Sequence, residues 1–296
     1  MADTATGSTH PTFLQAVRRA LPCVCLVALL IVCLVPDHSH DVGPDTAEFI
    51  FFDVGQGDAS LIRTEAGCVL IDAGTNLSED RLSAELKRLG IERIDCLLLT
   101  HAHEDHIGGA DRMLRDFDVK TVIARDTEEI DAASRAVWNA VRSCGAEVVK
   151  PKGITTYAVG GLILDVIVPF EEVQSDGNDS SLVVRVSYGD TAVLYMGDAE
   201  AATEKTLLTQ LTDGNFLRCD GLKLGHHGSD SSSCTEFLHA VSPHYAVASA
   251  GAGNSFGHPH GRVLSDLSEI GCICLRTDLN GTVTLISDGE SLICRQ

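Results

Sequence analysis

The chain has 296 residues, of which 44% are apolar and only 5% aromatic, a composition typical of a globular protein with a large core. Its 22 Lys and Arg stand against 42 Asp and Glu, a formal net charge of −20. Residues 1–46 hold two of the basic and four of the acidic side chains, so the remainder carries 20 against 38, a net of −18. This balance excludes a broad basic surface that grips a long polyanion, although bound divalent ions would still supply local positive charge.

The N-terminal segment differs from the rest of the chain. A basic region at residues 1–19 ends in Arg18-Arg19, and the run 20–36 that follows contains no charged side chain. This run is short for a membrane span, so it predicts either a signal-peptide core or a single membrane anchor. Acidic side chains in the linker 37–46 complete a charge asymmetry that favours export, with the body outside the cytoplasm, extracellular or membrane-anchored.

The first half of the body alternates strands and helices. Apolar runs bounded by glycine and aspartate predict the strands, and apolar residues at helical spacing predict the helices between them. The expected strands are 48–53, 59–64, 69–72, 96–99 and 120–125, and the expected helices are 79–89, 106–117 and 128–144. This alternation is typical of an α/β fold.

The second half begins with antiparallel strands and then alternates again. Paired glycines or Gly-Asp turns divide the apolar segments 155–168 and 181–196 into two hairpins. Later strands are expected at 220–224, 245–249, 273–276 and 282–287, and helices at 199–211, 234–241 and 261–270. The body therefore divides into two similar halves, each a sheet with covering helices, and has no linker strong enough to separate them into domains.

A metal-binding motif follows the apolar strand 96–99. His101 and His103 alternate with other residues on an extended backbone, so they point to the same side. The helix that follows places Asp105 and His106 beside them. Two imidazoles suit one ion, and a carboxylate with a third imidazole suits another, so this stretch predicts a site for zinc or a similar metal.

The stretch Thr100-His-Ala-His-Glu-Asp-His106 resembles the signature of the metallo-β-lactamase superfamily. That resemblance implies a four-layer αβ/βα sandwich over residues 47–296. Further motifs, in the same order along the chain, resemble one branch of it, the C-terminal hydrolase domain of ComEC-type competence proteins. They are Asp53-Val-Gly-Gln-Gly-Asp-Ala59, Leu70-Ile-Asp-Ala-Gly74, Asn178-Asp-Ser-Ser-Leu-Val183, Gly197-Asp198, Leu222-Lys-Leu-Gly-His-His-Gly-Ser229 and Phe256-Gly-His-Pro-His260.

The resemblance implies two divalent ions, zinc or manganese. His101 and His103 would hold one ion, Asp105 and His106 the other, and Asp198 would bridge both. A histidine of the Gly225-His-His-Gly228 turn would complete the second site. His226 is favoured over His227 because the first residue after a strand is the more rigidly placed, and His227 is then expected to contact substrate.

The superfamily pattern is incomplete in one respect. Many members place a further histidine between the first motif and the bridging aspartate, and this chain has none between His106 and His226. Asn178, Asp179 or a water molecule would have to take that position.

Four residues outside the ligand set are candidates for supporting roles. Asp58 or Asp72 is expected to hold a metal-bound histidine by a hydrogen bond from behind, with bonding inside its own turn as the alternative. Asn254 and His258 belong to a glycine-rich loop and are expected to contact a substrate oxyanion or to protonate a leaving group.

The resemblance favours a phosphodiesterase or nuclease that uses a metal-bridging hydroxide on single-stranded DNA or nucleotides, with Asp105, Asp198 and His258 as catalytic residues. One short apolar run cannot form a DNA channel, so the chain would stand alone or serve a separate membrane channel partner. Two alternatives remain open. One is hydrolysis of an acyl substrate such as a lactone, thioester or lactam, and the other is a non-catalytic, metal-dependent binding module at the cell surface.

Overall fold

The computed structural model describes residues 42–125, 131–169, 177–211 and 215–295. The run 20–36, expected as a signal-peptide core or anchor, and residues 37–41 of the expected linker lie outside these ranges. Among the described helices, none combines the length and the apolar character needed to cross a membrane.

The first sheet contains eight strands in the order β15-β14-β1-β2-β3-β4-β5-β6. Strands β15 to β3 are antiparallel to their neighbours, and β3 to β6 are parallel. The strands are β1 (Ala47–Phe51), β2 (Ser60–Thr64), β3 (Gly67–Ile71), β4 (Arg93–Leu99), β5 (Asp118–Ala124), β6 (Glu147–Val149), β14 (Val283–Ser287) and β15 (Leu292–Arg295).

The second sheet contains seven strands in the order β13-β12-β11-β10-β9-β8-β7. Hairpins join β7 to β10, and β10 to β13 run parallel. The strands are β7 (Ile154–Val159), β8 (Leu162–Ile167), β9 (Val183–Tyr188), β10 (Thr191–Tyr195), β11 (Gly221–Lys223), β12 (Tyr245–Ala248) and β13 (Ile273–Arg276).

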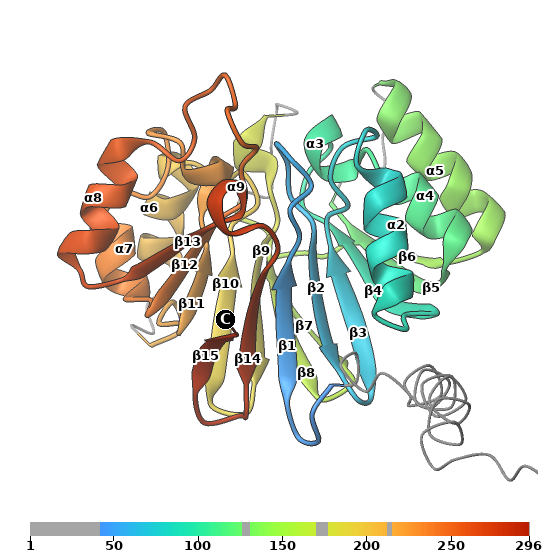
Figure 1. Cartoon of the computed structure of the whole chain (residues 1–296), viewed down its shortest axis with the longest axis horizontal. Helices are drawn as coiled ribbons and strands as arrows, with labels where there is room; N and C mark the ends of the chain where they lie inside the picture. The colour runs from blue at the N-terminus through green and yellow to red at the C-terminus, as the bar shows by residue number, and fades with distance from the viewer. Residues whose placement is uncertain (1–41, 126–130, 170–176, 212–214, 296) are drawn as a thin grey trace, which may run out of the picture. The chain divides into compact units, whose positions relative to one another are not determined.

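Helices cover the outer face of each sheet, and the two inner faces pack together (Figure 1). The first sheet carries α2 (Glu79–Arg88), α3 (Glu104–Ile107), α4 (Ala110–Asp116) and α5 (Ala132–Cys144). The second carries α6 (Ala201–Gln210), α7 (Thr235–Val241) and α8 (Gly261–Glu269), and the short α9 (Thr277–Asn280) follows β13. The expected α/β class, with two sheets and their covering helices, is confirmed. The expected division into one sheet for each half of the chain is wrong in one respect, because the C-terminal strands β14 and β15 pair with β1 and so complete the first sheet.

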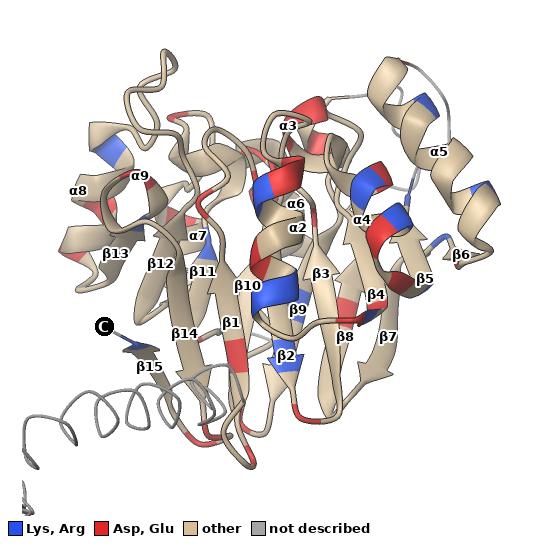
Figure 2. Cartoon of the chain, turned by 45° about the vertical axis from the view of Figure 1, so that its right-hand side comes forward, with Lys and Arg blue, Asp and Glu red and all other residues tan. Residues whose placement is uncertain are grey.

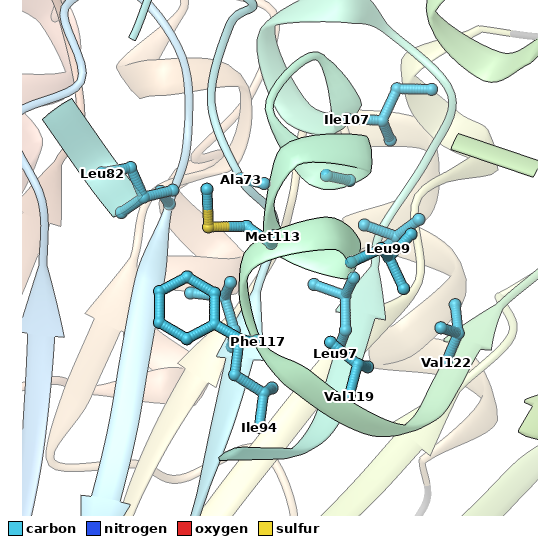
Figure 3. Close-up of a cluster of buried hydrophobic side chains, with 14 of the residues drawn as sticks. Ala73, Leu82, Ile94, Leu97, Leu99, Ile107, Met113, Phe117, Val119 and Val122 are labelled. Atoms are coloured by element: carbon cyan, nitrogen blue, oxygen red, sulfur yellow. The ribbon is translucent and has the colours of Figure 1, made fainter. Parts of the chain in front are cut away.

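Strand β4 shows how the sequence builds these layers. Leu97 and Leu99 belong to the buried cluster under the helices, whereas Cys96 and Leu98 belong to the cluster between the sheets. Side chains of a strand alternate between faces, so a run that is apolar at every position is buried on both sides. Figure 3 shows the helix-side cluster, where Met113 and Phe117 pack near Leu97.

The structure differs from the expected elements at three places. The helix expected at 106–117 is two short helices, because the β3–α2 loop packs against the turn between them. A Cβ on Gly109 would lie 2.4 Å from the carbonyl oxygen of Ala73. Helix α5 begins at Ala132, while residues 128–130 of the expected helix lie outside the described ranges. Strands β6 and β15 at the edges of the first sheet were not expected.

Candidate metal centre

Strand ends from both sheets bring the candidate ligands together. His101, His103 and the short helix α3 follow β4, Asp198 follows β10, and His227 lies in a single 3₁₀ turn after β11. Figure 2 shows the acidic residues of α3, and residues 100–103 connect the end of β4 to this helix. The parallel strands of the two sheets therefore present these side chains at one end of the sandwich.

The first group of ligand atoms comes from His101, His103 and Asp198, all within 4.8 Å of one another. The two imidazole rings lie 4.5 Å apart between centroids, and His101 Nε2 is 3.9 Å from Asp198 Oδ2. His101 is buried and His103 is half-buried. Burial pushes the pKa of His101 well below its usual value, so its imidazole is neutral and able to donate a lone pair.

The second group combines Asp105, His106, Asp198 and His227, again within 4.8 Å. His106 Nε2 lies 3.1 Å from Asp198 Oδ1, and His227 Nε2 lies 3.2 Å from Asp105 Oδ2 and 3.6 Å from Asp198 Oδ2. Asp198 thus belongs to both groups, with one carboxylate oxygen toward His106 and the other toward His101 and His227.

The position of Asp198 depends on the turn after β10. Gly197 has a φ of +53°, and a Cβ there would lie 3.0 Å from side-chain atoms of Ser181 and Thr100. The Asp198 backbone N–H donates to Ser181 Oγ at 3.0 Å. Burial alone would raise the pKa of the Asp198 carboxyl, but His106 and His227 hold that pKa well below its usual value. The carboxylate is therefore ionised and available to cations.

Asp72 holds His106 from behind. Its Oδ2 lies 2.8 Å from His106 Nδ1 and accepts from Thr100 Oγ1 at 2.7 Å, and its Oδ1 accepts from Thr100 N at 2.8 Å. Because Nδ1 bonds this carboxylate, Nε2 is the nitrogen that faces Asp198. Burial opposes the charge on His106, but Asp198 and Asp72 raise its pKa well above the usual value, so a metal ion at Nε2 would displace a proton. Burial raises the pKa of Asp72, and His106 offsets part of that rise.

Asp58 faces His227 in an ion-pair contact, and a buried lysine stands behind Asp58. Asp58 Oδ1 lies 3.3 Å from His227 Nδ1, and Lys223 Nζ lies 2.6 Å from Asp58 Oδ2. Lys223 is only 1% exposed. Burial opposes the charge on His227, but Asp198 and Asp58 raise its pKa to about 9. Sequence reasoning missed Lys223, although a charged residue inside the apolar β11 was a signal that it needed a buried partner.

The structure places His226 differently from the sequence expectation. Its Nδ1 lies 3.0 Å from Glu200 Oε1 and 3.3 Å from Asn178 Nδ2, outside both groups of ligand atoms. His226 and His227 both have positive φ, 45° and 55°. The backbone therefore curls in a left-handed turn after β11, and His227, the second residue of the turn, points toward Asp105 and Asp198.

Neither substitute for the missing histidine joins the ligand atoms. Asn178 donates to Glu200 Oε1 at 2.9 Å. Asp179 Oδ1 accepts from Glu200 N at 3.0 Å and from Thr203 Oγ1 at 2.7 Å, so it holds the start of α6. Among the described residues, the group around His101 and His103 therefore has three protein ligands.

The loop 250–260 lies against the turn that carries His227. Asn254 Nδ2 donates to the carbonyls of Gly251 and His258, and Asn254 Oδ1 accepts from His258 N. These bonds occupy the amide that was expected to meet substrate. Burial, together with the neighbouring His227, lowers the pKa of His258 to about 4, so this imidazole is neutral near pH 7.

The family follows from a comparison of the sequence with known families. Residues 52–252 match the model of the metallo-beta-lactamase superfamily. The chain belongs to this superfamily. This membership agrees with the two-sheet sandwich. It also agrees with the candidate ligands at one end of that sandwich, which are His101, His103, Asp105, His106 and Asp198.

Three bacterial relatives match most of this chain. It is 30% identical to ComE operon protein 3 of Bacillus subtilis over 88% of this chain, and 32% identical to Competence protein ComA of Neisseria gonorrhoeae over 86%. It is 27% identical to Recombination protein 2 of Haemophilus influenzae over 88%. The matches cover 35%, 34% and 31% of those proteins, so the chain spans about a third of their length. The resemblance to ComEC-type competence proteins is thereby confirmed.

Solved structures share the fold at low sequence identity. The metallo-beta-lactamase fold protein YhfI of Bacillus subtilis aligns with 81% of this chain and 100% of its own, at a TM-score of 0.56 and 10% identity. CmlA, a diiron beta-hydroxylase of Streptomyces venezuelae, aligns with 82% of this chain and 54% of its own, at 0.56 and 14%. At these identities the likeness shows the fold alone.

The candidate ligand atoms of this chain suit divalent cations. His101 Nε2, His106 Nε2 and Asp198 Oδ1 are buried and have no hydrogen-bond partner. Such atoms cost free energy unless something occupies the space between them. Imidazole nitrogens and carboxylate oxygens converging within 4.8 Å are a donor set for divalent metal ions.

Proposed function

We propose that the chain is a metal-dependent phosphodiesterase whose site holds two divalent cations. The observation that carries this proposal is the position of Asp198, which belongs to both groups. Its Oδ1 lies toward His106, and its Oδ2 lies toward both His101 and His227. His101, His103 and Asp198 would hold one ion, and Asp105, His106, His227 and Asp198 the other. Zinc and manganese both accept such nitrogen and oxygen ligands.

Divalent ions bound here would act as Lewis acids on a phosphoryl oxygen and would lower the pKa of a coordinated water. The protein's own residues set the geometry for that chemistry. Asp72 and Asp58 fix the rings of His106 and His227 so that Nε2 of each faces the site. Asp105 is the most open of the second group's carboxylates, with 29% of its side chain exposed, and lies on the solvent side.

The sequence indicated that His258 acts as a general acid, and this proposal gives it another role. With a pKa of about 4, its imidazole is neutral near neutral pH, and a neutral imidazole is a poor proton donor to a leaving group. Its Nδ1 is buried and without a partner among the described residues. We therefore assign His258 to hydrogen bonding with substrate rather than to general acid catalysis.

A phosphodiester substrate, such as single-stranded DNA or a nucleotide, is supported by the names of two relatives, one of which refers to competence and one to recombination. The net charge argues against wrapping of a long duplex, so short or single-stranded substrates fit better. Service to a separate membrane channel partner, and export with the catalytic domain outside the cytoplasm, belong to the same proposal.

The test uses the purified full-length chain, stripped of metal and reloaded with zinc or manganese. We expect two bound ions per chain and hydrolysis of bis(p-nitrophenyl) phosphate and single-stranded DNA, with no hydrolysis of a lactam. Asp198→Asn should reduce hydrolysis to the buffer rate. Asp116→Asn, in a carboxylate that bonds Ser83 and Lys87 far from the site, is the matched control and should keep activity.

Two results would refute the proposal. One is phosphodiester hydrolysis that survives Asp198→Asn. The other is fully metal-loaded protein that hydrolyses only the lactam or no substrate at all, which would favour the acyl hydrolase or the binding module instead.

A further inference from the structure

The loop 250–260 is anchored at its two ends and exposed at its tip. Gly251 N donates to Gln56 Oε1 at 3.2 Å, and His260 N donates to the carbonyl of Gly228 at 2.9 Å. The Asn254 side chain ties the two ends of the tip to each other. The anchored ends therefore contact both the β1–β2 loop and the His227 turn, and the tip is held in one shape.

Phe256 is the exposed apolar residue at this tip. Of its surface 62% is accessible, although the chain is poor in aromatic residues and buries most of its large apolar ones. One face of the ring stacks on His258, with centroids 5.6 Å apart and planes 23° from parallel. The other face is left open. An aromatic ring held this way in water loses hydrophobic stabilisation, so its exposure needs a reason.

A row of rings leads from Phe256 to the proposed metal ligand. His258 lies 6.0 Å from His227 between centroids, with planes 30° apart, and 5.3 Å from His226. His258 is 7% exposed, and its Nδ1 has no partner among the described residues. The Phe256 ring is thus two ring spacings from His227, at the exposed end of the loop that borders the ligand atoms.

Few basic side chains of the described residues near the site are available to bind a nucleic acid. Among the described residues, Lys223 is buried against Asp58, and Arg262 is engaged by Asp266 and by backbone carbonyls. Arg81 pairs with Asp53, and Arg125 donates to the carbonyl of Ser180. Most Lys and Arg in Figure 2 lie on the outer helices or within strands. Salt-dependent phosphate contacts, which dominate most nucleic-acid binding, are therefore scarce here, and stacking is the remaining general means of holding a base.

We propose that the open face of Phe256 is a stacking platform for the nucleobase next to the scissile phosphodiester. This inference rests on the proposed phosphodiesterase function and adds its substrate class, nucleotide esters rather than phosphodiesters in general. His258 supports the platform from beneath and offers Nδ1 to the same nucleotide. An anionic membrane surface fits less well, because the chain carries a net charge of −20.

The experiment compares two substrates that share a leaving group, thymidine 5′-(p-nitrophenyl phosphate) and methyl p-nitrophenyl phosphate. The ratio of their kcat/KM values isolates the contribution of the base. We expect the unchanged chain to prefer the thymidine ester. Phe256→Ala should lower the ratio about 5- to 150-fold, which corresponds to ~1–3 kcal/mol for one stacked base. Phe256→Trp should keep the ratio.

Leu279→Ala is the matched control. Leu279 is 71% exposed on α9, which touches the same loop through a hydrogen bond from Ala250 N to Thr277 Oγ1. This variant should leave the ratio unchanged. An unchanged ratio in Phe256→Ala would overturn the proposal. So would an equal fall in Leu279→Ala, which would show that the base preference does not depend on the Phe256 ring.

Binding without turnover separates this inference from the proposed hydrolysis. A dinucleotide that contains 2-aminopurine loses fluorescence when the base stacks. We expect quenching by the unchanged chain and by Phe256→Trp, but not by Phe256→Ala. Quenching without hydrolysis of either ester would refute the phosphodiesterase and retain the platform. Hydrolysis of both esters without quenching or base preference would retain the phosphodiesterase and refute the platform.

Discussion

Asp72→Asn tests whether the hydrogen bond behind His106 determines the affinity of the second metal group. The Asp72 carboxylate is 1% exposed and accepts three hydrogen bonds, two from Thr100 and one from the His106 imidazole. An asparagine has the same shape but carries an NH₂ group on one side. Whichever way the amide turns, at least one of its N–H groups meets another donor.

The expected loss follows from these contacts. Partners of metal-bound histidines typically contribute 10- to 100-fold in metal affinity, which corresponds to about 1.4–2.8 kcal/mol. We therefore expect the second ion to bind 10- to 100-fold more weakly in Asp72→Asn, and the first, at His101 and His103, to bind almost as before. The mismatched buried donor should also cost about 1–3 kcal/mol of unfolding free energy.

The assay is a competition titration with a chromogenic chelator, read alongside denaturant unfolding of the metal-free protein. Glu204→Gln is the matched control, because Glu204 is fully buried and its carboxylate accepts from the backbone N–H groups of Ser233 and Cys234. It should lose similar stability and keep both metal affinities. If Asp72→Asn binds both ions as tightly as the unchanged chain, the orienting role of Asp72 is wrong.

Three further predictions concern individual residues. His227→Gln should lower the bound metal from two ions to one per chain, whereas His226→Gln should keep two, as measured by elemental analysis; the reverse pattern would contradict the placement of these rings. Gly197→Ala should destabilise the fold by about 1–3 kcal/mol in denaturant unfolding, because its φ of +53° and contacts at 3.0 Å leave no room for a Cβ. Asp131→Ala should cost ~1 kcal/mol at neutral pH, since the Asp131 side chain caps α5 through Ser134 N. This hydrogen bond lowers the pKa of Asp131, so the stabilisation is present above the pKa of the unfolded chain and disappears as the pH falls through the lower pKa of the folded state; a stability difference that persists in strong acid would refute it.

Much of the fold could be predicted from local patterns. The apolar run at β4, the glycine turns of the β7–β10 hairpins and the helical spacing of apolar residues in α2 and α5 depend on neighbours in the sequence. Edge strands β6 and β15 could not be found in this way. Both are short and partly exposed, so they lack a strong apolar pattern and exist through pairing with β5 and β14.

The choice between His226 and His227 shows where sequence reasoning ends. The direction of each ring depends on the left-handed φ of both residues and on the contacts of Gly225 and Gly228 with other turns. A Cβ on Gly225 would lie 2.3 Å from the carbonyl oxygen of Ala199, and one on Gly228 would lie 2.7 Å from the Pro259 side chain. Those neighbours are set by the packing of the second sheet and its loops.

The sequence by itself determined the superfamily, the layered α/β architecture and the residue types that surround the candidate metals, because motifs and apolar periodicity are local properties. Only the tertiary structure decided that Asp198 lies between two groups of histidines, that Lys223 supports Asp58, and that Asn254 bonds its own loop. Each of these depends on atoms brought together across the two sheets, and such distances follow from packing rather than from spacing along the chain.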